Sequence, residues 1–228
     1  MSIMKPNSSP CLLLGDVVGS RGATDRRALH DAVERALRTV NEAVPAVRPL
    51  RVTVGDEFQG SYASLGGALE AALRVHLELR PHVDTRIGLG RGEVTVLDAE
   101  RGIEDGPGWW AAREAIEAVE EAATRPATRR LRTAYRSADA GDGGAGGPHA
   151  AGATDEAAVN AALLCRDHLV GSLSDRSVRL LRGLMEPHTT QGELAAREGI
   201  SASAVSQRVR HDGIGAVLAA QELLRGLP

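Results

Sequence analysis

The sequence predicts an α+β protein in which a domain of strands and helices precedes an all-helical domain. Up to residue 137 the expected order is strand, helix, two strands, helix, strand, then a further strand and helix. That order is typical of the ferredoxin-like, or palm, arrangement, an antiparallel sheet with helices on one face. Residues 138–156 are rich in glycine and alanine and contain no large apolar residue, which predicts a flexible linker. Residues 157–228 show only helical periodicity.

The first elements follow from the spacing of apolar residues. A continuous apolar run at 11–14, followed by Asp16 and Gly19, indicates a buried strand with polar residues at its end. Residues 25–44 repeat apolar side chains every three or four positions, so we expect a helix there. Residues 50–54 and 58–62 are expected to pair as a hairpin around a tight turn.

The next elements complete the expected sheet domain. Residues 65–77 form a second amphipathic pattern typical of a helix. We expect residues 85–90 and 94–97 to be two paired strands, and residues 109–123 to be a helix. Alternating side chains at 128–136 indicate an added edge strand.

Composition excludes several functional classes. With 27 basic and 30 acidic residues, the net charge of −3 gives no general attraction to nucleic acid or anionic membrane, so any such partner must be recognised locally. Lys5 is the only lysine, which argues against Schiff-base and P-loop chemistry. Cys11 and Cys165 lie in apolar runs and are expected to be buried thiols. No secretory segment or membrane-length apolar run is present, so we expect a cytoplasmic protein.

Two carboxylates are expected at one edge of the sheet. Asp16 ends the first strand and Asp56 lies in the hairpin turn, and in a palm sheet these positions are neighbours. Close carboxylates repel each other, and a divalent cation such as Mg²⁺ or Mn²⁺ is their usual partner, often together with substrate phosphates. The pattern therefore predicts a metal and nucleoside triphosphate site. Taken singly, Asp56 with Glu57 could instead be a solvated turn, and Asp16 a cap residue.

The residues around both carboxylates resemble known families. "LLLGDVVGSR" resembles the first-strand motif of class III nucleotidyl cyclases, and "TVGDEFQG" resembles their Gly-Asp hairpin and the GGDEF motif of diguanylate cyclases. The resemblance implies that Asp16 and Asp56 are metal ligands. It also implies that the nucleotide contacts the residues beside them, which are Val17, Val18, Gly19, Gly55 and Glu57.

Two further stretches extend the resemblance and show departures from it. "RIGLGRGEV" is similar to a cyclase strand and turn, and "GWWAAREA" falls where cyclases have a helix with a catalytic Asn and a transition-state Arg. The resemblance implies that role for Arg113. However, Trp109 stands at the Asn position and Val52 at the base-reading Lys position, which favours nucleotide binding over cyclase activity. Over its whole length, the chain resembles the SatD family.

The C-terminal stretch 190–210 has the spacing of a helix-turn-helix. Gly199 suits a left-handed turn, Ser201 can cap the second helix, and Val205 can anchor it in the core. The pattern resembles the DNA-binding domains of sigma factors and response regulators. The exposed face of the second helix would then carry the DNA-contacting residues Ser203, Ser206, Gln207 and Arg210. Seven arginines and six acidic residues at 171–228 leave little net charge, so protein contact, dimerisation or plain helix packing remain alternatives.

Together these patterns predict a cytosolic two-domain regulator, with a nucleotide- and metal-binding domain coupled to a DNA-binding helix-turn-helix. A homodimer is expected, with the final helix and its Val217, Leu218, Leu223 and Leu224 as a candidate interface. One alternative is an active metal-dependent nucleotidyl cyclase or nucleotidyltransferase. Another is a protein-interaction scaffold in which both sites are vestigial.

Overall fold

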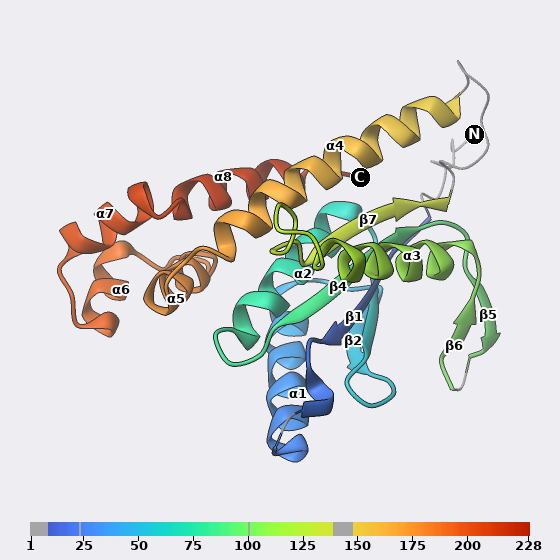
Figure 1. Cartoon of the computed structure of the whole chain (residues 1–228), viewed down its shortest axis with the longest axis horizontal. Coiled ribbons are helices and arrows are strands. Elements are labelled where there is room, and N and C mark those ends of the chain that lie inside the picture. The colour runs from blue at the N-terminus through green and yellow to red at the C-terminus, as the bar shows by residue number, and fades with distance from the viewer. Residues whose placement is uncertain (1–8, 23, 100, 139–147) are drawn as a thin grey trace, which may run out of the picture.

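The computed structural model describes residues 9–22, 24–99, 101–138 and 148–228. Figure 1 shows a sheet with helices on both sides, and a helical region that runs along one border of the sheet and extends beyond it. The chain is thus an α+β protein followed by an all-helical region, as the sequence predicts. No helix in the described part of the chain is long and apolar enough to cross a bilayer.

The main sheet has five strands centred on β1 and β4. In spatial order they are β2 (Arg48–Val52), β3 (Phe58–Tyr62), β1 (Cys11–Val17), β4 (Thr85–Arg91) and β7 (Thr133–Ser137). The first four are antiparallel to their neighbours, and the predicted hairpin of β2 and β3 is confirmed. β7 pairs with β4 in parallel, so the expectation of a purely antiparallel sheet was wrong.

One face of the sheet is covered by α1 (Arg26–Ala43) and α2 (Leu65–Leu79). Both helices begin with a side-chain cap: Asp25 accepts the N–H of Ala28, and Ser64 accepts that of Gly67. Leu13 of β1 and Ile87 of β4 point into the core shared with these helices, and both are almost fully buried. The predicted helices at 25–44 and 65–77 are therefore confirmed.

The opposite face is covered by α3 (Pro107–Ala122), so the expectation of helices on one face only was wrong. Leu12 and Leu14 alternate with Leu13 and pack on this side with Ala112. A strand that returns parallel to its predecessor needs a crossover, and α3 is the crossover between β4 and β7. Gly90 allows it to lie close, since a Cβ there would be 2.2 Å from the carbonyl oxygen of Gly108.

A small separate hairpin precedes α3. It consists of β5 (Thr95–Asp98) and β6 (Ile103–Asp105), which pair only with each other. The expected pairing of residues 85–90 with 94–97 was wrong, because both edges of β4 are already occupied by β1 and β7. Figure 1 shows this hairpin projecting from the end of the molecule opposite to α5–α7.

Five helices make up the C-terminal region. They are α4 (Pro148–Val170), α5 (Asp175–Leu184), α6 (Gln191–Glu198), α7 (Ala202–His211) and α8 (Ile214–Arg225). Residues 148–156, expected to belong to a linker, lie in α4, and residues 139–147 of that linker lie outside the described residues. Leu73 and Leu77 of α2 share a hydrophobic cluster with Leu181 and Val205 of this region. The two halves therefore pack on a common core.

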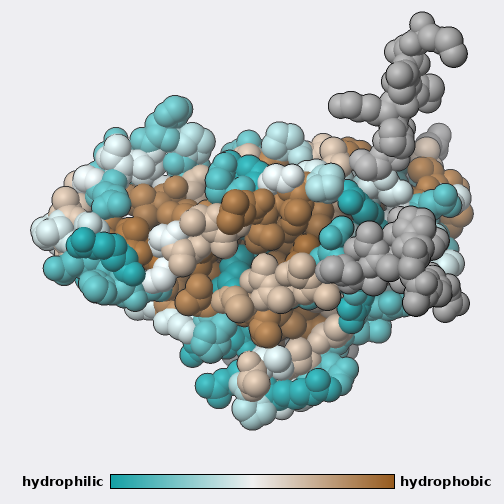
Figure 2. Space-filling model, turned by 90° about the horizontal axis from the view of Figure 1, so that it is seen from above, coloured by the Kyte–Doolittle hydropathy of each residue, from teal (hydrophilic) through white to brown (hydrophobic). Residues whose placement is uncertain are grey.

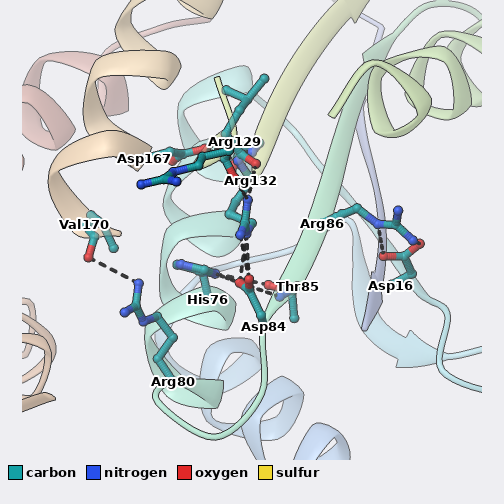
Figure 3. A network of polar contacts seen from close by, with 12 residues as sticks. Asp16, His76, Arg80, Asp84, Thr85, Arg86, Arg129, Arg132, Asp167 and Val170 are labelled. Carbon is teal, nitrogen blue, oxygen red and sulfur yellow. Dashed lines mark hydrogen bonds and ion pairs between the residues drawn. The ribbon is translucent and has the colours of Figure 1, made fainter. Parts of the chain in front are cut away.

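A buried carboxylate fastens α4 to the sheet (Figure 3). Asp167 accepts the backbone N–H groups of Arg132 (2.8 Å) and Thr133 (2.7 Å), at the start of β7. It also forms an ion pair with Arg166 at 3.1 Å, and Arg166 in turn donates to the Thr133 hydroxyl at 3.0 Å. Both charged side chains are nearly inaccessible to water, so each depends on the other for compensation.

A second contact holds the end of the chain on α2. The N–H groups of Leu65 and Gly66, which have no partner within their helix, donate to the carbonyl oxygens of Pro228 (2.9 Å) and Leu227 (3.2 Å). Arg91 of β4 also donates to the Pro228 oxygen, at 2.5 Å. Leu227 and Pro228, which follow α8, thus contact the sheet domain directly.

His76 lies beside the Asp167 network in a buried position on α2. Its Nδ1 is 3.3 Å from the Thr85 hydroxyl and 3.8 Å from Asp84. Burial lowers the pKa of His76 to about 4, and the neighbouring carboxylates offset this only in part. His76 is therefore neutral near pH 7. Burial alone would raise the pKa of Asp84, but the hydrogen bonds and charge of Arg132 outweigh it, so the pKa is lowered.

We expect the free energy of unfolding to decrease as the pH falls from 6.5 towards 4. In this range His76 is protonated in the unfolded state but stays neutral in the folded state. The loss from this residue approaches about 1.4 kcal/mol per pH unit. Urea unfolding at pH 7.5 and 5.0 measures this loss of stability. Asp84, whose pKa is lowered, stays ionised at both pH values. His76→Gln keeps a polar partner for Thr85 without titrating, and its stability should fall less. Equal losses in both proteins would refute the assignment.

We also expect Gly90→Ala to destabilise the protein by about 1–3 kcal/mol, because the added methyl group meets the backbone of α3. Chemical denaturation measures the change. Gly22→Ala is the matched control, since a Cβ there has no neighbour within 4 Å. A Gly90→Ala protein as stable as the control would contradict the close approach of α3.

Candidate functional site

Asp16 lies at the end of β1 and is bound by an arginine on the neighbouring strand. Arg86 donates from Nε and Nη2 to the two oxygens of Asp16, both at 2.9 Å (Figure 3). The third nitrogen of Arg86 contacts Glu120 of α3 at 2.5 Å. The hydrogen bond to Asp16 is the main cause of a raised pKa for Arg86. The charge of Asp16 is therefore already compensated.

Asp56 lies in the β2–β3 turn and faces α1. It lines a small cavity of about 40 Å³ together with Ser20, Arg26 and His30. Ligand pockets usually measure about 300–1,000 Å³, so this cavity cannot enclose a nucleotide. Its lining nevertheless places two basic side chains of α1 close to the Asp56 turn.

The two aspartates lie at the same end of the paired strands β1 and β3, because Gly15 pairs with Phe58. Each has its own neighbours, however: Asp16 is paired with Arg86, and Asp56 lies with residues of α1. Within the described ranges, no group of three or more acidic, histidine or cysteine side chains could hold a metal ion. As arranged, these residues do not fit a two-ion site, and metal binding by Asp16 and Asp56 stays a prediction.

Arg113 of α3 reaches over the β2–β3 turn. Its Nη2 lies 3.5 Å from a carboxylate oxygen of Glu57, and both side chains are largely exposed. An ion pair of this kind contributes about 0–1 kcal/mol, so it leaves Arg113 free to exchange Glu57 for another anion. The structure thus brings together two of the site residues predicted from the sequence.

The turns beside the aspartates differ in how open they are. Val17 is buried, and the N–H of Val18 donates to the carbonyl oxygen of Asp84 at 2.9 Å. Gly19 and Gly55 both have left-handed backbone conformations, with φ of 73° and 66°, and a Cβ at either would meet nothing within 4 Å. The open backbone is therefore at the two glycines rather than at the valines.

In the C-terminal region, α6 and α7 are joined by a tight turn. Gly199 is left-handed with φ of 63°, Ser201 caps α7 through the N–H of Ala204, and Val205 is fully buried. These features agree with the sequence expectation. Of the predicted contact residues, Ser203, Gln207 and Arg210 are exposed and Ser206 is half-buried.

The apolar residues of α8 divide between core and surface. Val217 and Leu224 are buried within the chain and cannot serve a dimer contact without opening the core, whereas Leu223 is 80% exposed. Figure 2 shows apolar residues gathered over α4 and α8 on the surface seen from above.

Cys165 of α4 is exposed, so its predicted burial was wrong, while Cys11 is buried and its pKa is raised by burial to about 12.

Sequence reasoning missed the charged partners of the site. Arg86 and Glu120 were not predicted, although the antiparallel register sets Arg86 directly opposite Asp16. An arginine-rich cleft formed by Arg80, Arg129, Arg130 and Arg132 was missed as well, because its residues come from separate segments.

Comparison with known proteins places the chain in a family. No curated protein matches it. Residues 11–133 match the SatD family, a stretch that runs from the first residue of β1 to the first residue of β7 and contains Asp16, Asp56, Arg86 and Arg113. Since this is more than half of the 228 residues, the chain belongs to the SatD family.

Proposed function

We propose that the protein is a cytosolic two-domain regulator, in which α6 and α7 form a DNA-binding helix-turn-helix and the sheet domain binds a nucleotide. The observation that carries the proposal is the α6–α7 unit. It combines a left-handed Gly199, a capped second helix and a buried Val205 with an exposed polar face on α7.

The exposed face of α7 has the chemistry that DNA contact needs. Gln207 can pair with base edges, and Arg210 can reach guanine or phosphate. Glu198, at the end of α6, is held by Arg179 at 2.7 Å, which keeps that carboxylate away from a phosphate backbone. The region carries little net positive charge, so we propose binding as a homodimer, for which the exposed Leu223 of α8 is available.

The proposed nucleotide site is the sheet edge around Asp16 and the β2–β3 turn. Arg113 contacts Glu57 in the β2–β3 turn, and Arg26 lines the small cavity that Gly55 and Asp56 also line. Arginine is suited to phosphate because its planar donors match phosphate oxygens. Mg²⁺ or Mn²⁺ could join only if Arg86 released Asp16, and Glu120 is the carboxylate positioned to keep Arg86 when that happens.

An active nucleotidyl cyclase or nucleotidyltransferase is the second candidate. It is favoured by the position of Arg113, which contacts Glu57, the residue next to the predicted metal ligand Asp56. Against it stands Trp109, which packs with Leu12, Leu14 and Ala112 at the position where cyclases have the catalytic Asn.

For the DNA-binding half, we expect Gln207→Ala and Arg210→Ala each to weaken binding to DNA from upstream of the protein's own gene by about tenfold, as loss of base or phosphate contacts does. Fluorescence anisotropy at low salt measures the dissociation constant. Arg38→Ala removes the same charge from an exposed position on α1 and should change little. Absence of binding to any DNA at low salt would remove the regulator proposal and leave a protein-interaction scaffold.

For the nucleotide-binding half, we expect calorimetry with ATP or GTP and Mg²⁺ or Mn²⁺ to show binding without release of pyrophosphate. Asp16→Asn, Asp56→Asn and Arg113→Ala should each weaken it about tenfold, while Asp31→Asn, an exposed change on α1, should not. Pyrophosphate release that disappears in both aspartate variants would make the protein an enzyme. If no nucleotide binds under any condition, both the nucleotide-binding regulator and the enzyme are excluded.

A further inference from the structure

A cleft rich in arginine lies where the sheet domain meets the C-terminal helices. It has a volume of about 420 Å³ and is lined by the end of α2, the α2–β4 loop, the α3–β7 loop and Gly171 after α4. This is the size of a small-molecule pocket, but the lining is polar and charged. The cleft is separate from the Asp16 edge, whose residues take no part in it.

The charges around the cleft do not cancel. Asp84 is the carboxylate in its lining, and Arg132 binds both of its oxygens at 2.9 and 2.8 Å. Arg80, Arg129 and Arg130 form no ion pair with a carboxylate in the described residues. Three guanidinium charges therefore remain around one hollow.

These three guanidinium groups retain unused donors. Arg80 donates from Nη1 to the Val170 carbonyl oxygen at 3.2 Å, and Arg130 uses its Nη1 for Ser172 and the His168 carbonyl oxygen. The exposed Arg129 side chain has no hydrogen-bonding partner in the described part of the chain. A guanidinium group carries several N–H donors, so most of those on the three residues are available.

A purely structural role explains only part of this arrangement. Arg80 and Arg130 bind carbonyl oxygens at the end of α4, where cations are favoured by the helix dipole. This role accounts for Arg80 and Arg130, which bind two different carbonyl oxygens. It does not account for Arg129, nor for the convergence of three like charges, which repel each other unless an anion lies between them.

We propose that this cleft binds the di- or triphosphate group of a small ligand, either a nucleotide or free pyrophosphate. Phosphate oxygens would accept from Arg80, Arg129 and Arg130, the arrangement in which charge-assisted hydrogen bonds are strongest. Arg132 stays with Asp84 and holds the floor of the cleft in place.

The position of the cleft makes such a ligand a link between the two halves. Arg80 belongs to the sheet domain and already contacts Val170, at the end of α4. Arg130 reaches Ser172, in the turn that leads to α5 and then to α6 and α7. A bound phosphate would contact both halves at once, so its binding energy depends on how they are docked. The proposal does not require nucleotide binding at the Asp16 edge.

The test is calorimetric titration of the full chain with pyrophosphate, ATP, GTP and adenosine, without divalent cations. We expect pyrophosphate and the nucleotides to bind and adenosine not to bind. Arg129→Ala should weaken binding about tenfold, and Arg129→Ala with Arg130→Ala more strongly. Arg125→Ala, an exposed arginine outside the cleft, should leave it unchanged.

Comparing the ligands shows which molecule supplies the phosphate group. Tighter binding of a nucleotide than of pyrophosphate indicates a contact to the base or sugar, and equal binding indicates free pyrophosphate. The proposal is overturned if pyrophosphate produces no more heat than chloride at equal ionic strength, or if the double variant binds as well as the unmodified protein. It is also overturned if the double variant loses affinity only for DNA, because the cleft would then hold a DNA phosphate.

Discussion

The buried Asp167 carboxylate is the interaction on which the arrangement of the two halves depends. It accepts two backbone N–H groups at the start of β7, and its negative charge compensates the buried charge of Arg166. Removing either partner would leave an uncompensated buried charge, which usually costs about 3–5 kcal/mol. Because Asp167 belongs to α4 and the N–H groups that donate to it belong to the sheet domain, the position of the helical region follows from this contact together with the shared core.

That fastening has a functional consequence. In the proposed regulator, a DNA-binding unit joined only by a flexible linker would not respond to a ligand bound on the sheet domain. Here Leu73 and Leu77 of α2 share a core with Val205 of α7, and Pro228 covers the first turn of α2. A ligand that shifted α2 would therefore change the packing behind α7. Packed cores move between discrete arrangements, which is the kind of element that coupling between sites requires.

Local patterns predicted most elements, whereas relations between elements were out of reach. The cap at Ser201 and the turn at Gly199 depend on nearby residues, and the structure has both. The face covered by α3 could not be predicted, because apolar spacing shows that a helix is half-buried but not which side of a sheet it covers. The partner of Asp16 is a question of strand register, and the arginine cleft joins segments about fifty residues apart in the chain.

In both proposed phosphate sites, arginine would take the part that a metal ion or lysine takes in many phosphate-binding proteins. The chain has one lysine, outside the described residues, and at the sheet edge a guanidinium group lies where two carboxylates would otherwise repel each other. Arginine stays charged at every physiological pH, so such a site needs no ion to be loaded and no proton to be gained. A guanidinium pair can also exchange one anion for another without a bare charge being left behind. Asp16, Arg86 and Glu120 already form such an exchangeable set, which suits a domain that senses a phosphate more than one that cleaves it.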